Sequence, residues 1–113
     1  MKNFNSKLHI LFVCGMNQKR SPTAESIYRN DDRILVRSAG VSESSKNKLT
    51  IKNIEWADII LVMEQKYKQR ILKNFRDKVE LPRIESLDIP DEYEYMDVEL
   101  INIIKSSVER FIS

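Results

Sequence analysis

Short apolar runs alternate along the chain with longer segments in which apolar residues recur with helical spacing. Four of the runs are bounded by polar or turn-forming residues, a pattern that predicts β-strands. They cover residues 8–14, 33–38, 58–63 and 82–87. The first and third are almost entirely apolar, which is typical of strands buried on both faces of a sheet. The second is more polar and suits a sheet edge.

Between and after these runs lie four segments with helical character. They cover residues 21–30, 49–56, 65–75 and 98–112. The apolar residues of the last two fall on one helix face. Alternation of strands and helices predicts one α/β domain over residues 1–113, with a parallel four-stranded sheet flanked by helices and joined by right-handed crossovers. The polar, basic stretch 42–48 is interpreted as a solvated loop.

The composition of the chain argues against several kinds of partner and site. Nineteen basic and seventeen acidic residues leave a net charge of +2, a bias too small to argue for nucleic acid as a partner. One cysteine excludes an internal disulfide, and a single histidine argues against zinc, so no metal or cofactor is expected. No apolar stretch approaches the roughly 20 residues that span a bilayer, and residues 1–7 lack the apolar core of a signal peptide. We therefore expect a cytoplasmic protein without a membrane partner.

The single cysteine carries the main functional signal. Cys14 ends the first apolar run, and Arg20 follows at C-x5-R spacing. Ser21 and Pro22 then suit the N-cap and first position of a helix, whose N-terminus attracts anions. The intervening backbone N–H groups can form an anion nest, and the guanidinium matches two phosphoryl oxygens. The predicted phosphate-binding residues are Gly15, Met16, Asn17, Gln18, Lys19 and Arg20.

The same surroundings favour a reactive thiol. A helix N-terminus and a neighbouring cation lower the pKa of a cysteine from about 8.5 to roughly 3.5–7.5. Cys14 is therefore predicted to attack phosphorus as a thiolate, with the Ser21 hydroxyl donating to it. A buried structural cysteine is the alternative interpretation, and C-x5-R spacing alone would be a weak signal. The strand, loop, arginine and helix in register favour the nucleophile.

Four segments resemble the low-molecular-weight protein tyrosine phosphatases, in the order in which that family has them. Residues 13–25 (VCGMNQKRSPTAE) resemble the family's phosphate-binding loop, and 38–40 (SAG) resemble the end of its second strand. Residues 57–64 (ADIILVME) are similar to its A-D-x-I-L-V-M segment. Residues 89–93 (IPDEY) are similar to the late loop in which a D-P-Y carries the general acid. The resemblance covers nearly the whole chain.

The resemblance implies a sheet of order 2-1-3-4 and a role for each matching residue. Cys14 matches the nucleophile, Arg20 the phosphate-binding arginine and Asp91 the general acid, with Asp88 as the fallback. Asn17 and Ser21 match the residues that support the loop and the thiolate. Gln18 and Tyr93 match positions beside the substrate. Ligands of parallel sheets bind beyond the carboxyl ends of the strands, which independently places Asp91 near Cys14.

Three departures from the family concern the cleft. Lys19 stands where the family has a second cysteine, and Glu92 stands where a proline follows the acid. The region between Gly40 and Ala57 is shorter than in ordinary members and lacks the segment that forms a second wall of the cleft. These differences leave the chemistry intact and the choice of substrate open.

Together these features predict a phosphomonoester hydrolase that works through a phosphocysteine on Cys14. Its partners would be a phosphotyrosyl protein or a small phosphomonoester, with inorganic phosphate as the product. One alternative is a phosphate-binding module without turnover. Another is a phosphatase for sugar, nucleotide or RNA-end phosphates. A phosphocysteine carrier would not need Asp91, and a thioredoxin-linked arsenate reductase would need further cysteines.

Overall fold

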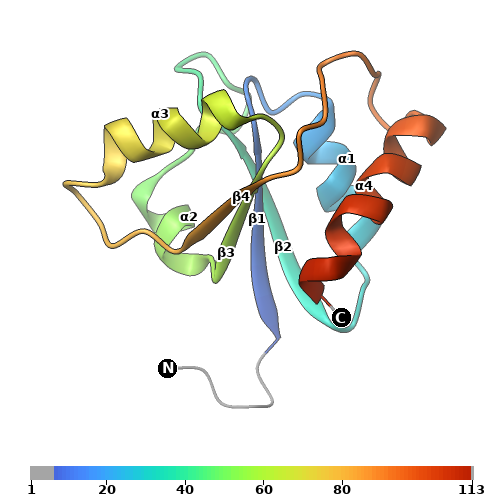
Figure 1. Cartoon of the computed structure of the whole chain (residues 1–113), viewed down its shortest axis with the longest axis horizontal. Coiled ribbons are helices and arrows are strands. Elements are labelled where there is room, and N and C mark those ends of the chain that lie inside the picture. Colours follow the sequence, from blue (N-terminus) through green and yellow to red (C-terminus); the bar gives the residue numbers. More distant parts are fainter. Residues whose placement is uncertain (1–6, 113) are drawn as a thin grey trace.

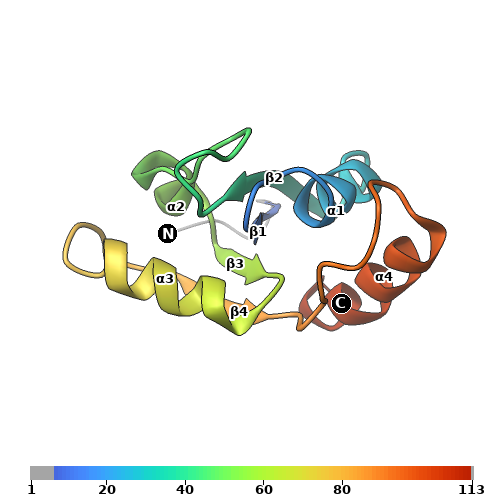
Figure 2. The same cartoon turned by 90° about the horizontal axis from the view of Figure 1, so that it is seen from above.

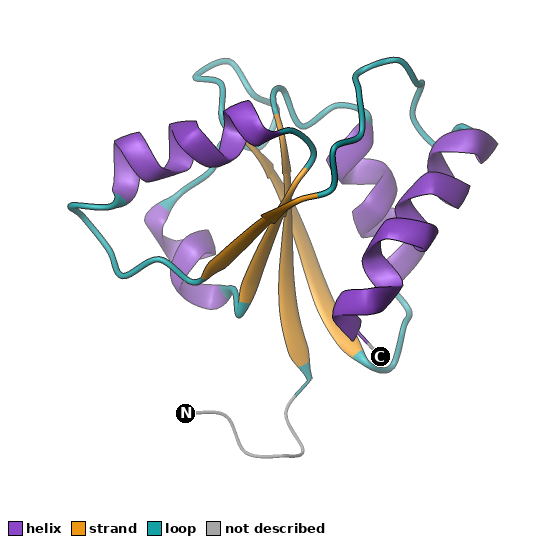
Figure 3. Ribbon diagram, viewed as in Figure 1, coloured by secondary structure: helices purple, strands orange, loops and turns teal. Residues whose placement is uncertain are grey.

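Four parallel strands form one sheet in the order β2-β1-β3-β4 in the computed structural model, which describes residues 7–112 (Figures 1 and 3). The strands are β1 (Leu8–Cys14), β2 (Ile34–Gly40), β3 (Ile59–Val62) and β4 (Arg83–Ser86). This order confirms the α/β topology expected from the sequence. Residues 1–6, for which the sequence shows no apolar signal-peptide core, lie outside the described part.

Four helices cover the two faces of the sheet. They are α1 (Arg20–Tyr28), α2 (Ile51–Trp56), α3 (Gln65–Phe75) and α4 (Val98–Ile112). Figure 2 shows α1 and α4 on one face and α2 and α3 on the other, as right-handed crossovers require. Across residues 7–112, none of these helices combines the length and apolarity needed to cross a bilayer.

The core lies along β1 and β3. Ile10, Leu11, Phe12 and Val13 are all fully buried, as predicted for a strand covered on both faces. The strand predicted to be an edge, β2, is indeed at the edge of the sheet. The apolar stripe of α4 packs inward through Leu100, Ile104 and Val108.

Two helix starts differ from the prediction. Helix α1 begins at Arg20 with Lys19 as its N-cap residue, so Ser21 lies inside the first turn and makes no capping bond. The Ser21 hydroxyl points instead to Cys14. Helix α2 begins at Ile51 rather than at residue 49, because the Thr50 side chain caps it by accepting from Asn53 N at 3.2 Å.

The loops that leave the carboxyl ends of the strands gather at one edge of the sheet, at the top of Figure 1. They follow β1, β2, β3 and β4 at residues 15–19, 41–50, 63–64 and 87–97. Strand β2 runs two residues further than predicted because Gly40 pairs with Cys14. This edge brings together chain segments that lie far apart in the sequence.

Candidate active site

Cys14 lies at the carboxyl end of β1 and is 3% exposed. Its Sγ lies 2.9 Å from the Ser21 Oγ. Asn17 Nδ2 donates to the same Ser21 oxygen at 3.0 Å, which occupies one of its lone pairs. A hydroxyl has one proton to donate. The Ser21 proton can therefore be directed at the sulfur and stabilise a thiolate.

The loop around this thiol is shaped by a left-handed residue. Asn17 has φ of 56°, a conformation that asparagine adopts more readily than most residues. Its side chain is buried, and its bond to Ser21 ties the loop to α1. The turn at Asn17 lets residues 15–19 curl above Cys14.

A second segment, residues 41–46, holds the carbonyl groups of this loop; we call it the brace. Val41 N donates to Cys14 O at 3.0 Å, Ser42 N to Gly15 O at 3.0 Å and Lys46 N to Met16 O at 3.1 Å. The C=O and N–H of a trans peptide point in opposite directions. The following N–H groups are therefore turned away from the brace, and those of residues 15–19 donate to no group within residues 7–112. The loop presents the nest of unpaired donors that an anion requires.

Gly40 permits the close approach of brace and loop. A Cβ at this position would lie 2.8 Å from the Gly15 carbonyl oxygen, inside the contact distance of two such atoms. The stretch 42–48 is a loop, as predicted, but its support of the phosphate-binding loop was not foreseen. The basic composition of the stretch gave no sign of this role.

Three hydrogen bonds hold the Arg20 guanidinium, and they leave two of its N–H groups unused. Nη1 donates to Glu64 Oε2 at 2.5 Å and to Ile89 O at 2.7 Å, and Nη2 donates to Tyr67 OH at 2.8 Å. A guanidinium has five N–H groups. The two that remain, on Nε and Nη2, belong to neighbouring nitrogens on one edge of the plane. That edge can bind two oxygens of one phosphoryl group.

The Nε atom of Arg20 is a buried donor that faces the cavity. Within the described chain, it is the one buried side-chain nitrogen or oxygen that lacks a hydrogen-bond partner. Leaving a buried charged donor unpaired is unfavourable, by about 1–3 kcal/mol or more. The site is therefore prepared for an acceptor that reaches this atom.

The pKa values of Arg20 and of its partners Glu64 and Tyr67 are shifted by burial and by the contacts among them. Burial opposes the charged form of Glu64, but the hydrogen bond and the positive charge of Arg20 together outweigh burial and lower the pKa of the carboxyl. Burial raises the pKa of the Tyr67 phenol above its ordinary value, and Arg20 only partly offsets this. Burial also works against charge on Arg20, yet the bonds to Glu64 and Tyr67 leave its pKa raised. At neutral pH, Arg20 is a cation held by a carboxylate and a neutral phenol.

Asp91 faces the free edge of Arg20. Its Oδ1 lies 3.8 Å from Nε, and its side chain is 67% exposed. The late loop is docked on α1, because Met96 N donates to Thr23 Oγ1 at 2.9 Å and the Tyr95 hydroxyl pairs with Ser26 at 2.8 Å. This docking holds the Asp91 segment over the sheet edge.

Asp88 is engaged elsewhere. Its Oδ1 accepts from Ser86 Oγ at 2.7 Å. Unlike Asp91, it does not line the small cavity, of about 140 Å³, above Cys14. That cavity is lined by Cys14, Gly15, Met16, Gln18, Lys19, Arg20, Tyr67 and Asp91.

Solved structures with this fold are similar over nearly the whole chain. The arginine phosphatase YwlE of Geobacillus stearothermophilus is 25% identical, with a TM-score of 0.69 and 92% of each chain covered. A low-molecular-weight protein tyrosine phosphatase of T. tengcongensis is 21% identical, with a TM-score of 0.70 and coverage of 92% of this chain and 99% of that one. The corresponding enzyme SP-PTP of Streptococcus pyogenes has a TM-score of 0.74 at 17% identity, with 94% of both chains covered. No family model and no curated protein sequence matches the chain.

The chain has the fold of the low-molecular-weight protein tyrosine phosphatases. The resemblance seen in the four sequence segments is thus confirmed, and members of this family are cysteine-dependent phosphatases. Lys19, at the position of the family's second cysteine, forms an ion pair with Glu94 at 3.2 Å. Tyr93 is half-buried against the core and does not line the cavity above Cys14. Gln18 does line it.

Glu64 and Tyr67 are the site residues that sequence reasoning missed. Glu64 ends the 57–64 segment, but no role was assigned to it. Tyr67 looked like part of the apolar face of α3, because its spacing to Ile71 is helical. The available signal for a site role was the hydroxyl group of Tyr67, a polar group on a largely apolar side chain, about one helical turn after the end of a strand.

Within residues 7–112, no three side chains of the metal-binding types cluster as a metal site.

Proposed function

We propose that the chain is a phosphomonoester hydrolase in which Cys14 is the nucleophile. The observation that carries this proposal is the free edge of Arg20, which faces the same cavity as the thiol and the unpaired loop amides. The neighbours support it. Wzb of Escherichia coli K30 was solved in complex with phosphate, and Wzb of Vibrio vulnificus with benzylphosphonate. A mutant of the YwlE arginine phosphatase carries a phosphorylated active-site serine.

The first step forms an S–P bond and breaks the P–O bond to the leaving group. The Cys14 thiolate supplies the electron pair, while Arg20 and the amides of residues 15–19 bind the equatorial oxygens, on which negative charge is spread. Asp91 gives its proton to the departing oxygen as that bond breaks. General acid help of this kind is worth about 10²–10⁴-fold in rate.

The second step reverses the role of Asp91. As a carboxylate it takes a proton from water, whose oxygen attacks phosphorus and breaks the S–P bond. The thiolate leaves, and the Ser21 hydroxyl at 2.9 Å is placed to stabilise its charge. Inorganic phosphate is released, and the enzyme returns with Asp91 protonated.

The size of the cavity supports a substrate that places only its phosphoryl group inside. A volume of about 140 Å³ is well below the roughly 300 Å³ at which drug-sized pockets begin, so it receives the phosphoryl group and little else. The leaving group then lies at the mouth, beside Gln18, Lys19 and Asp91. A phosphotyrosyl protein or a small aryl phosphomonoester fits this arrangement.

The decisive experiment compares wild type with Cys14→Ser on a panel of phosphotyrosyl peptides, phosphoarginine, sugar phosphates and nucleotide phosphates. We expect turnover of at least one class by wild type and none by the variant, which should still bind inorganic phosphate. Turnover by Cys14→Ser close to that of wild type would exclude the nucleophile. Inactivity of both proteins, with phosphate bound by both, would indicate a binding module instead.

The acid is tested with a matched pair of variants. Asp91→Asn should slow an alkyl phosphate, which has a poor leaving group, far more than p-nitrophenyl phosphate, which has a good one. Asp88→Asn removes the same charge three positions earlier in the same loop and should show no such selectivity. The opposite pattern would move the acid to Asp88.

A further inference from the structure

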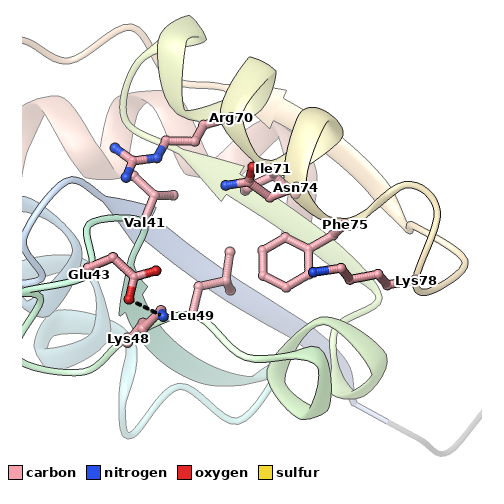
Figure 4. A pocket seen from close by; sticks show the side chains of 9 residues that line it. All are labelled: Val41, Glu43, Lys48, Leu49, Arg70, Ile71, Asn74, Phe75 and Lys78. Atoms are coloured by element: carbon pink, nitrogen blue, oxygen red, sulfur yellow. Dashed lines mark hydrogen bonds and ion pairs between the residues drawn. The ribbon is translucent and has the colours of Figure 1, made fainter.

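A second cavity, of about 410 Å³, opens between α3 and residues 41–49 (Figure 4). It shares no lining residue with the cavity above Cys14. Its volume falls in the range of about 300–1,000 Å³ that is usual for pockets binding small organic molecules. The chemistry proposed for Cys14 makes no use of it.

The floor of this cavity is apolar. Ile71 and Leu49 are 1% and 3% exposed, and Figure 4 shows the Leu49 side chain next to the Phe75 ring. Val41 completes the floor from the start of the brace. Because Ile71 and Leu49 are already almost completely buried, the apolar surface that a ligand can cover here is mainly that of the half-buried Phe75, with a smaller part from Val41.

The rim is cationic. Lys48 is neutralised by an ion pair with Glu43. The side chains of Arg70 and Lys78, in contrast, form no hydrogen bond or ion pair with a group of residues 7–112. Arg70 does act on Glu43, adding to the Lys48 hydrogen bond that lowers the pKa of that carboxyl. After the Lys48–Glu43 pair is counted, the cavity retains two positive charges.

Arg70 and Asn74 provide directed donors. They are four residues apart on α3 and therefore lie on the same side of the helix, and both line the cavity. A guanidinium next to a side-chain amide can bind the oxygens of one anionic group. Figure 4 shows these two side chains on α3 above the apolar floor.

The wall opposite α3 is already ordered. Asn47 Nδ2 donates to Ser38 O at 2.6 Å, Leu49 N to Gly40 O at 2.9 Å and Ser45 Oγ to Ser42 O at 2.7 Å. These bonds fix the segment without a ligand. A molecule that enters therefore does not have to order the wall, which favours binding.

We propose that this cavity is an accessory binding site for an amphipathic organic anion, a molecule with an aromatic or short alkyl body and one carboxylate, sulfonate or phosphate group. The apolar body contacts Leu49, Ile71 and Phe75. The anionic group binds Arg70 and Asn74, and Lys78 adds to the attraction.

The test is an NMR titration of the full chain with 2-naphthalenesulfonate, followed through side-chain methyl signals. We expect saturable shifts at Val41, Leu49 and Ile71, with little change at Met16, which lines the catalytic cavity. The neutral analogue 2-naphthylmethanol should bind at least tenfold more weakly. Shifts confined to Met16 would place the probe in the catalytic cavity and overturn the proposal, as would the absence of saturable shifts.

Matched charge reversals test the role of Arg70. Arg70→Glu should raise the dissociation constant of the sulfonate at least tenfold. Lys73→Glu changes the net charge equally at an exposed position of α3 that does not line the cavity, and it should change that constant less than twofold. Equal effects of the two variants would show that only net charge matters and would refute the site.

Discussion

Tyr67→Phe removes the single hydroxyl that binds Nη2 of Arg20, and it leaves the aromatic ring in place. In the wild type this bond is 2.8 Å long and is one of three that hold the guanidinium, and the same hydroxyl donates a weaker bond to Glu64 Oε2 at 3.2 Å. Its loss removes one of the bonds that orient the guanidinium, at the nitrogen whose other N–H faces the phosphoryl group. We expect the variant to fold and to bind phosphate with a less well oriented Arg20.

The magnitude follows from the type of bond. A hydrogen bond that involves a charged group contributes about 1.5–3 kcal/mol. We take the lower value, about 1.5 kcal/mol, because water in the adjoining cavity can partly replace the phenol. For a domain of this length, this loss lowers Tm by about 6 °C. A similar loss in the transition state lowers kcat/KM about tenfold, mainly through kcat, because the equatorial oxygens carry most charge there.

The assay combines thermal unfolding with steady-state hydrolysis of an aryl phosphate. Tyr28→Phe is the matched control, because its hydroxyl is also bonded, to Glu109 at 3.0 Å, but lies outside the catalytic cavity. Tyr28→Phe should lower Tm and leave kcat/KM unchanged. If Tyr67→Phe likewise lowers Tm and keeps kcat/KM within twofold of wild type, Tyr67 is only structural and the positioning of Arg20 has been wrongly attributed.

Two further outcomes follow from the site. The lowered pKa of Glu64 means that its bond to Arg20 stabilises the fold above the unfolded-state pKa, taken as 4.5, and that this contribution is lost as pH falls through the folded-state pKa. Glu64→Gln should therefore lose less stability than wild type on acidification below pH 4.5, and an unchanged acid profile by denaturant unfolding would contradict this. Gly40→Ala should cost about 1–3 kcal/mol of unfolding free energy, because the added Cβ meets the Gly15 carbonyl. Gly15→Ala should cost less, because its Cβ meets the end of the Tyr67 side chain, and the reverse order would refute the close-approach argument.

The sequence alone was sufficient to predict the helices and strands and their order along the chain. Hydrophobic periodicity depends on neighbours along the chain, so α3 and α4 were bounded correctly at Gln65–Phe75 and Val98–Ile112. Composition separated the buried strand β1 from the edge strand β2 for the same reason. Cys14, Arg20 and Ser21 also lie close together in the sequence, and one loop brings them into a single site.

Contacts between distant segments were decided only by the tertiary structure. Glu64, Tyr67 and Ile89 converge on Arg20 across 44 to 69 residues of sequence, because parallel strands deliver their carboxyl ends to one edge. No local pattern marks a tyrosine on a helix face as a partner for a particular guanidinium. The brace is a similar case, because its backbone N–H groups, rather than its basic side chains, bind the carbonyl groups of the phosphate-binding loop. Backbone hydrogen bonds between distant segments leave almost no trace in residue type, and only the folded chain reveals them.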